Sequence, residues 1–239
     1  MWWYRFFNKR NPEKDLNVLV ESLKTLIAND LKSVILFGSY GGDEFHSQHS
    51  DVNVMVVAGM APDVLKKMEP ALERWLRRGH AAPVLVAPHE LPGFARAFPI
   101  EFLDMQDRHR VLQGDDPLAS LSVDRQHLRA QCEHDLALIQ LRLRQSSASG
   151  DARALRAVLF KSQTSLLTLL NAMARLEGMG PQRDRIKAAE QLAERFHWDI
   201  AVLKRLQELK HKDVRADLND LTTQSLKLLE SVLQLLHMR

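Results

Sequence analysis

The use of proline and glycine changes abruptly near residue 121. Residues 1–121 hold eight of the nine prolines, seven of the ten glycines and 12 of the 15 aromatic residues. Residues 122–239 are rich in leucine, alanine, glutamine and arginine, which favour helices, and carry few residues that end them. A chain of 239 residues is long enough for two parts with separate cores. We therefore expect an N-terminal α/β (α+β) domain with a mixed sheet over residues 11–121, preceded by an aromatic and basic segment at 1–10, and an all-α helical bundle over residues 122–239.

Charge and cysteine content exclude several classes of protein. The 33 basic and 30 acidic residues leave a net charge of +3, too small to predict a nucleic-acid or anionic-membrane surface. The single cysteine, Cys132, excludes an intrachain disulfide and a cysteine-based zinc site, and we expect it to be buried. No apolar run approaches the roughly 18 residues of a membrane span, and the first residues lack the pattern of a secretory signal. The sequence thus predicts a cytoplasmic protein without a membrane span.

Apolar periodicity and turn residues predict the order helix, strand, turn, strand, helix, strand, strand in the N-terminal part. The predicted segments are a helix over 11–30, strands over 34–37 and 52–57, a helix over 63–78, and strands over 83–87 and 100–105. In the C-terminal part we expect helices near 124–146, 152–177, 182–195, 200–212 and 217–237. The leucine-rich faces of these helices predict the core of a bundle.

The residues with the clearest chemical use lie between Val34 and Val57. Gly38 lets the backbone approach a phosphate without a Cβ clash, and Ser39 adds a hydroxyl beside exposed N–H groups at a helix start, which bind anions. Asp51 and Asn53 are two residues apart on a predicted strand and therefore point to one face. A carboxylate and an amide oxygen on one face can hold Mg²⁺, which prefers oxygen ligands and substrate phosphates.

This segment resembles the polymerase-β-like nucleotidyltransferase superfamily, whose motif is a strand, then Gly-Ser, then Asp-x-Asp in a second strand. The resemblance covers residues 34–57. The helical part is similar only in architecture to the all-α domain that bacterial two-domain members, including aminoglycoside nucleotidyltransferases, append. Members transfer a nucleoside monophosphate from a nucleoside triphosphate (NTP) to a hydroxyl or phosphate, using divalent metals. The resemblance implies that Gly38 and Ser39 bind the triphosphate and that Asp51 and Asn53 hold Mg²⁺.

The chain departs from the family pattern at two places. Asn53 stands where the family has its second metal-binding aspartate, so one negative charge is missing. The predicted strand 83–87 contains no carboxylate that could serve as the family's third acid. The next predicted strand offers Glu101 and Asp104, which would face opposite sides because they are three residues apart. Glu101 is our candidate for the catalytic general base, with Asp104, or no residue at all, as the alternatives.

Two main hypotheses follow for the function. In the first, the protein binds Mg-NTP and transfers a nucleoside monophosphate to an acceptor that is a small molecule, a protein or RNA. In the second, it is a catalytically degenerate module of the same fold with a regulatory or protein-interaction role. A third reading is a toxin–antitoxin-like component that acts through protein contact. At the site of Asp51 and Asn53, Mg²⁺ should bind weakly unless the triphosphate brings it. The helical domain is the expected surface for self-association or a protein partner.

Overall fold

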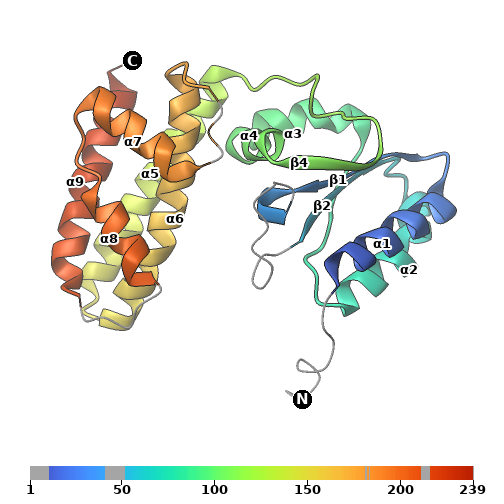
Figure 1. Cartoon of the computed structure of the whole chain (residues 1–239), viewed down its shortest axis with the longest axis horizontal. Coiled ribbons are helices and arrows are strands. Elements are labelled where there is room, and N and C mark those ends of the chain that lie inside the picture. Colours follow the sequence, from blue (N-terminus) through green and yellow to red (C-terminus); the bar gives the residue numbers. More distant parts are fainter. Residues whose placement is uncertain (1–10, 41–51, 181, 183, 211–215, 239) are drawn as a thin grey trace. The chain divides into compact units, whose positions relative to one another are not determined.

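The computed structural model describes residues 11–40, 52–180, 182, 184–210 and 216–238 (Figure 1). The chain divides into two compact units. The sheet unit comprises Met1–Ala95 and Asp104–Ser122, and the helical unit comprises Arg96–Leu103 and Val123–Arg239. Within the described residues, no helix is both long and apolar enough to cross a membrane.

The described residues of the sheet unit form one mixed sheet of four strands, in the order β3-β2-β1-β4 (Figure 1). The strands are β1 (Leu31–Phe37), β2 (Asn53–Ala58), β3 (Val84–Val86) and β4 (His109–Gly114). Strand β1 runs antiparallel to both β2 and β4, whereas β3 runs parallel to β2. The mixed sheet predicted from the sequence is confirmed.

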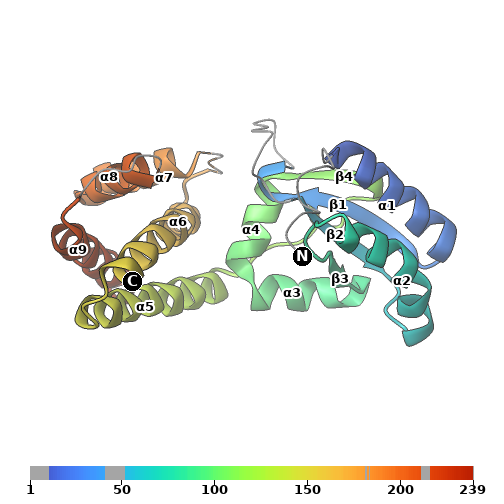
Figure 2. The ribbon, with the colours of Figure 1, turned by 90° about the horizontal axis from the view of Figure 1, so that it is seen from below.

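Helices cover both faces of this sheet. They are α1 (Pro12–Ile27), α2 (Pro62–Arg77) and α3 (Leu91–Ala97). Helices α1 and α2 lie side by side on one face, and α3 lies on the other (Figure 2). Leu36 and Val54 are buried in one cluster with the apolar stripes of α1 and α2. Because side chains alternate along a strand, Asn53 points to the opposite face, the one that α3 covers.

The first turn of α1 is fixed to the end of α2 by a buried charged group. Asp15 is only 4% exposed, and its Oδ2 lies 2.9 Å from Nε2 of His80. The other carboxylate oxygen accepts a hydrogen bond from Arg78. The ring of Trp75 stacks on His80 with the centroids 3.9 Å apart. The start of α1 is therefore a fixed point of the sheet unit, because a buried carboxylate is stable only when it is paired in this way.

The strand predicted over residues 100–105 is wrong. This segment belongs to the helix α4 (Pro99–Asp107), which Pro99 opens and which has Glu101 in its first turn. Proline and acidic side chains both favour a helix N-terminus. The Ile100 N–H donates to Oε1 of Gln131 at 3.0 Å, which satisfies one of the donors that a first turn leaves unpaired. The fourth strand is β4, which follows α4 directly and which the sequence analysis did not predict.

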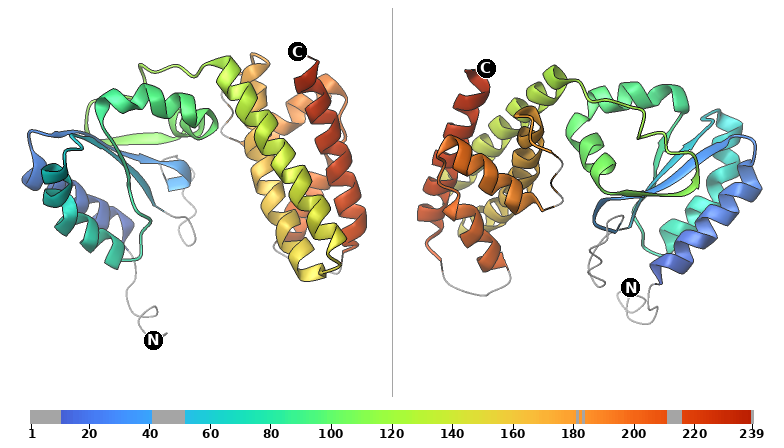
Figure 3. Two further views of the ribbon diagram at one scale, coloured as in Figure 1. Left: turned by 180° about the vertical axis from the view of Figure 1, so that it is seen from behind. Right: turned by 45° about the horizontal axis from the view of Figure 1, so that its top comes forward.

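In the described part of the helical unit, five helices follow one another along the chain after residue 123. They are α5 (Arg125–Ala148), α6 (Ala152–Leu176), α7 (Arg185–Phe196), α8 (Ala201–Lys210) and α9 (Leu218–His237). The all-α expectation for this part is confirmed, and each helix lies within a few residues of its predicted range. Helices α5, α6 and α9 pack against one another (Figure 3).

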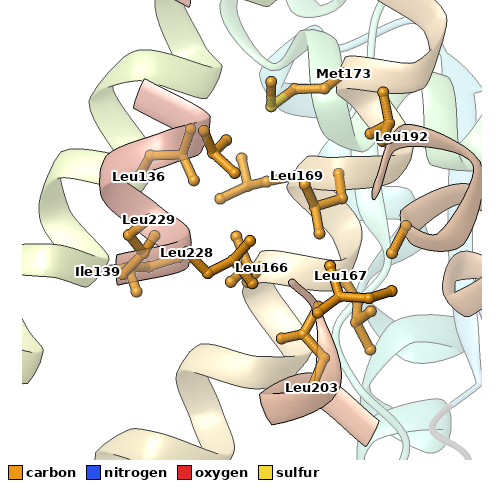
Figure 4. Packing of buried hydrophobic residues seen from close by; sticks show 14 of the residues in the cluster. Leu136, Ile139, Leu166, Leu167, Leu169, Met173, Leu192, Leu203, Leu228 and Leu229 are labelled. Atoms are coloured by element: carbon orange, nitrogen blue, oxygen red, sulfur yellow. The ribbon is translucent and has the colours of Figure 1, made fainter. Parts of the chain in front are cut away.

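Aspartates fix the starts of these helices, and leucines fill the space between them. Four of the helices begin after an aspartate whose carboxylate accepts backbone N–H groups of the first turn: Asp124, Asp151, Asp184 and Asp217. Figure 4 shows Leu136 of α5, Leu166 of α6 and Leu229 of α9 among the buried side chains of the shared core. The leucine-rich faces identified in the sequence therefore form the core of the bundle.

Cys132 on α5 is fully buried in this core, as the sequence predicted. Burial, reinforced by the nearby carboxylates of Asp135 and Glu133, raises the pKa of its thiol to about 12. Because the thiolate is the reactive form, we expect a thiol-specific reagent at about pH 8 to leave the native protein unmodified. In denaturant the same reagent should modify one thiol per chain. Rapid modification of the native protein would contradict the burial of this side chain.

Candidate functional site

The strand β1 ends in a single turn of 3₁₀ helix, η2 (Gly38–Tyr40). The Gly38 N–H donates to the carbonyl of Arg108 at 3.0 Å, which attaches the start of the turn to the residue before β4. Gly38 has a φ of +79°, in the left-handed region that other residues rarely adopt. A glycine is therefore needed for the chain to leave β1 along this path.

Asn53 lies directly beside this glycine. It is the first residue of β2, and the antiparallel register places it opposite Phe37. A Cβ atom on Gly38 would lie 3.1 Å from Nδ2 of Asn53, closer than side chains normally pack. The structure thus brings together two of the predicted site residues, Gly38 and Asn53, and Ser39 lies in the same turn.

The predicted metal ligands are only partly covered by the structure. Asp51 lies outside the described residues, so Asn53 is the predicted ligand whose position the structure gives. A carboxamide oxygen suits Mg²⁺, but one such oxygen does not make a site. Among the side chains that the structure describes, no group of three or more histidines, cysteines, aspartates and glutamates could hold a metal ion. Any metal here would need Asp51 and oxygens of the substrate, so metal binding by Asp51 and Asn53 stays a prediction.

The strand next to β2 offers no acid beside Asn53. Strand β3 pairs with Met55–Val57 of β2 and consists of valine and leucine. Its paired residues therefore supply no carboxylate. This agrees with the absence of carboxylates that the sequence shows over residues 83–87.

Glu101 and Asp104 lie on the helix α4 and not on a strand. Oε2 of Glu101 accepts a hydrogen bond from Nε2 of Gln131 at 3.0 Å, inside the helical unit. Oδ1 of Asp104 accepts one from Nη2 of Arg108 at 2.5 Å, inside the sheet unit. The premise that the two acids face opposite sides of a strand is wrong, because residues three apart on a helix are neighbours. The role of Glu101 as general base stays a prediction.

His109 is the titratable side chain that shares a row of the sheet with Asn53, since both residues are paired with Phe37. Its Nδ1 lies 3.1 Å from the carbonyl oxygen of Gln106, and its Nε2 lies 3.0 Å from Oδ2 of Asp116. Partial burial works in the opposite direction, but the hydrogen bonds from His109 and from the Leu118 backbone hold the pKa of Asp116 below its ordinary value. Both ring nitrogens therefore lie within hydrogen-bond distance of an oxygen, and His109 fastens the segment after β4.

Three residues that the sequence did not indicate lie at the turn on the α1 side of the sheet: Tyr40, Glu13 and Arg110. Tyr40 is 8% exposed, and Glu13 of α1 lies close enough to act on its hydroxyl. Burial, followed by the negative charge of Glu13, raises the pKa of Tyr40, although Arg110 acts in the opposite direction. Nη2 of Arg110 lies 3.1 and 3.3 Å from the two carboxylate oxygens of Glu13. No sequence signal connects Glu13 with Arg110, because they are 97 residues apart and meet only through the register of β4.

No family model and no curated protein matches the chain. Among solved structures, it is similar to the crystal structure of the spectinomycin adenyltransferase AAD(9) from Enterococcus faecialis with ATP and spectinomycin. The TM-score is 0.56 at 12% sequence identity, and the match covers 93% of this chain and 99% of that chain. A likeness at this identity concerns the fold alone. The chain has a nucleotidyltransferase-like fold, in which a mixed-sheet α/β unit is joined to a unit of helices.

Proposed function

We propose that the protein binds a nucleoside triphosphate, with ATP as the first candidate, at the turn Gly38–Tyr40 and the start of β2. The observation that carries this proposal is the left-handed Gly38 beside Asn53, where a Cβ on the glycine would lie 3.1 Å from the amide nitrogen of Asn53. A turn that begins with such a glycine has no Cβ to keep a phosphate from its backbone N–H groups. The structural likeness to a protein crystallised with ATP supports the same ligand class.

The residues of this chain have distinct tasks in the proposed complex. Backbone N–H groups of the turn after Gly38, whose own N–H donates to the Arg108 carbonyl, bind phosphate oxygens together with the hydroxyl of Ser39. Asp51 and Asn53 are the residues that would hold Mg²⁺, and this ion supplies charge neutralisation of the triphosphate when it is bound. Since Asn53 carries no charge, the free protein should hold the ion weakly.

Transfer of the nucleoside monophosphate is the finer proposal, and it depends on a general base. Glu101 is the candidate base, acting on a hydroxyl of an acceptor that is a small molecule, a protein or RNA. A nucleotide-binding module without transfer is the second candidate function. Asn53 at the aspartate position, together with the absence of a carboxylate from residues 83–87, favours this second function because both leave less negative charge at the site.

Calorimetric titration with ATP, GTP, CTP and UTP, with and without Mg²⁺, tests the binding proposal. We expect ATP to bind in the presence of Mg²⁺, and Asn53→Asp to tighten Mg²⁺ binding several-fold because a full negative charge then faces the ion. Asn219→Asp, at an exposed position on α9, adds the same charge elsewhere and should leave the titration unchanged. A folded protein that binds no NTP at millimolar concentration would refute the proposal.

A label on the α-phosphate separates the two candidate functions. Label transfer by the unaltered protein that disappears in Asp51→Ala would establish an enzyme. Intact NTP binding without transfer, in both the unaltered protein and Asn53→Asp and with acceptors of all three classes, would establish the binding module.

A further inference from the structure

The turn Gly38–Tyr40 is attached to its surroundings at both ends. At its first residue, the Gly38 N–H donates to the Arg108 carbonyl. At its last residue, the side chain of Tyr40 is buried in the same apolar cluster as α1 and α2. There it meets Glu13, and Glu13 also binds the guanidinium of Arg110. Arg108, just before β4, therefore contacts the turn through its backbone carbonyl, and Arg110, in β4, is connected to it through Glu13.

The two faces of the sheet separate this attachment from the proposed ligand. Arg110 is paired with Leu36, whose side chain is buried against α1 and α2. Directly opposed residues of antiparallel strands share a face, so Arg110 lies on the α1 side. Asn53, beside Gly38, lies on the opposite side, as the alternation along β2 requires. Tyr40 therefore supports the turn from the α1 side of the sheet, opposite the face that carries Asn53.

We infer that Tyr40, Glu13 and Arg110 are positioning residues that hold the turn Gly38–Tyr40 ready for the triphosphate. This inference rests on the proposed function. A turn that begins with a glycine has many backbone conformations, and fixing one of them before the ligand arrives removes an entropic cost from binding. The fixed start of α1 makes Glu13 a firm support, because Asp15 in the same turn of the helix is buried and paired.

The ion pair between Glu13 and Arg110 contributes little to the stability of the fold. Both side chains are about half exposed, at 55% and 51%, and exposed ion pairs are weak. Removing the pair should therefore leave thermal unfolding almost unchanged. A change in nucleotide affinity without a change in unfolding temperature is a result that a purely structural role would not give.

The first test compares the ATP affinity of single variants. We expect Tyr40→Phe and Glu13→Gln each to weaken ATP binding about fivefold, the effect of one lost hydrogen bond. The double variant should be no weaker than either single variant, because both remove the same contact. The matched control is Glu21→Gln, which breaks the exposed pair with Lys24 on the same helix and should leave ATP binding unchanged. Equal affinities for Tyr40→Phe and Glu21→Gln would overturn the inference.

The second test observes Tyr40 without any nucleotide. The chain has two tyrosines, Tyr4 and Tyr40, so in a Tyr4→Phe background the tyrosinate absorbance reports Tyr40 alone. Adding Glu13→Gln should move the ionisation of Tyr40 to lower pH, whereas adding Glu21→Gln should not. If Glu13→Gln produces no shift, Glu13 does not hold Tyr40 and the inference fails.

The results distinguish a failure of the positioning role from a failure of the proposed function. If the unaltered protein binds no NTP, the proposed function fails and the positioning role fails with it. If the unaltered protein binds ATP and Tyr40→Phe binds it equally well, the inference alone fails and the proposed function stands.

Discussion

Replacing Gly114 by alanine should destabilise the protein by about 4 kcal/mol or more, a range that only severe backbone or core damage reaches. Gly114 ends β4 with a φ of +79°, and a Cβ there would lie 1.9 Å from the carbonyl oxygen of Lys32. This neighbour is backbone of the antiparallel partner β1, so it cannot turn aside as a side chain could. The pairing of β1 with β4 would have to open at Ser33, which stands opposite Gly114.

Gly150 provides the control for this substitution. Its φ is +71°, but a Cβ there would have no atom within 4 Å. Gly150→Ala should therefore lower the free energy of unfolding by only about 1–2 kcal/mol, the cost of a side chain at a positive φ. Calorimetric unfolding of both variants against the unaltered protein measures the difference. Equal losses would mean that β1 and β4 tolerate the extra atom and that the close approach at Lys32 is not rigid.

Replacing Gly38 by valine should lower the affinity for ATP by about 100-fold or more, which is in practice a loss of binding. Valine adds a branched side chain at a φ of +79° and places its Cβ 3.1 Å from Nδ2 of Asn53. The turn would then move, and the added methyl groups would fill the space over the backbone N–H groups. Titration calorimetry measures the affinity, and circular dichroism checks that the fold persists.

Gly93→Val is the matched control for Gly38→Val. Gly93 lies on α3 in the same unit, its φ is not positive, and a Cβ there meets no atom within 4 Å. We expect this variant to bind ATP as the unaltered protein does. If Gly38→Val also keeps full affinity, the nucleotide does not bind at this turn, even if the protein binds it elsewhere.

The parts of the fold that could be predicted have local signals in the sequence. The helices of the bundle show leucines at helical spacing and begin at capping aspartates such as Asp124 and Asp151. In the sheet unit, the glycine turn directly follows β1, and β2 is the next strand along the chain. The neighbourhood of Gly38 and Asn53 therefore follows from a local pairing of two consecutive strands.

The errors have a physical reason in contacts between distant residues. The segment Ile100–Met105 is short and has four apolar side chains among its six residues, a pattern that suits a strand as well as a helix. Its helical form depends on Pro99 and on Gln131, which lies 31 residues from Ile100. Strand β4 has a polar sequence and a weak strand signal of its own, and it is defined by pairing with β1. The group of Tyr40, Glu13 and Arg110 could not be predicted without the register of that strand.

Helix α4 has a consequence for the modularity of the chain. Residues Arg96–Leu103 are grouped with the helical unit, and Ile100 is part of its core. Residues Asp104–Ser122 are grouped with the sheet unit. A fragment that begins at Val123 would lack Ile100 and leave Gln131 without its backbone donor. A fragment that ends at Ala95 would lack Gln106, whose amide donates to the carbonyls of Leu118 and Leu121. Neither unit can be excised by one cut in the chain, so a single crossover that exchanges the whole helical unit between proteins of this fold also carries β4, a strand of the sheet unit, along with it.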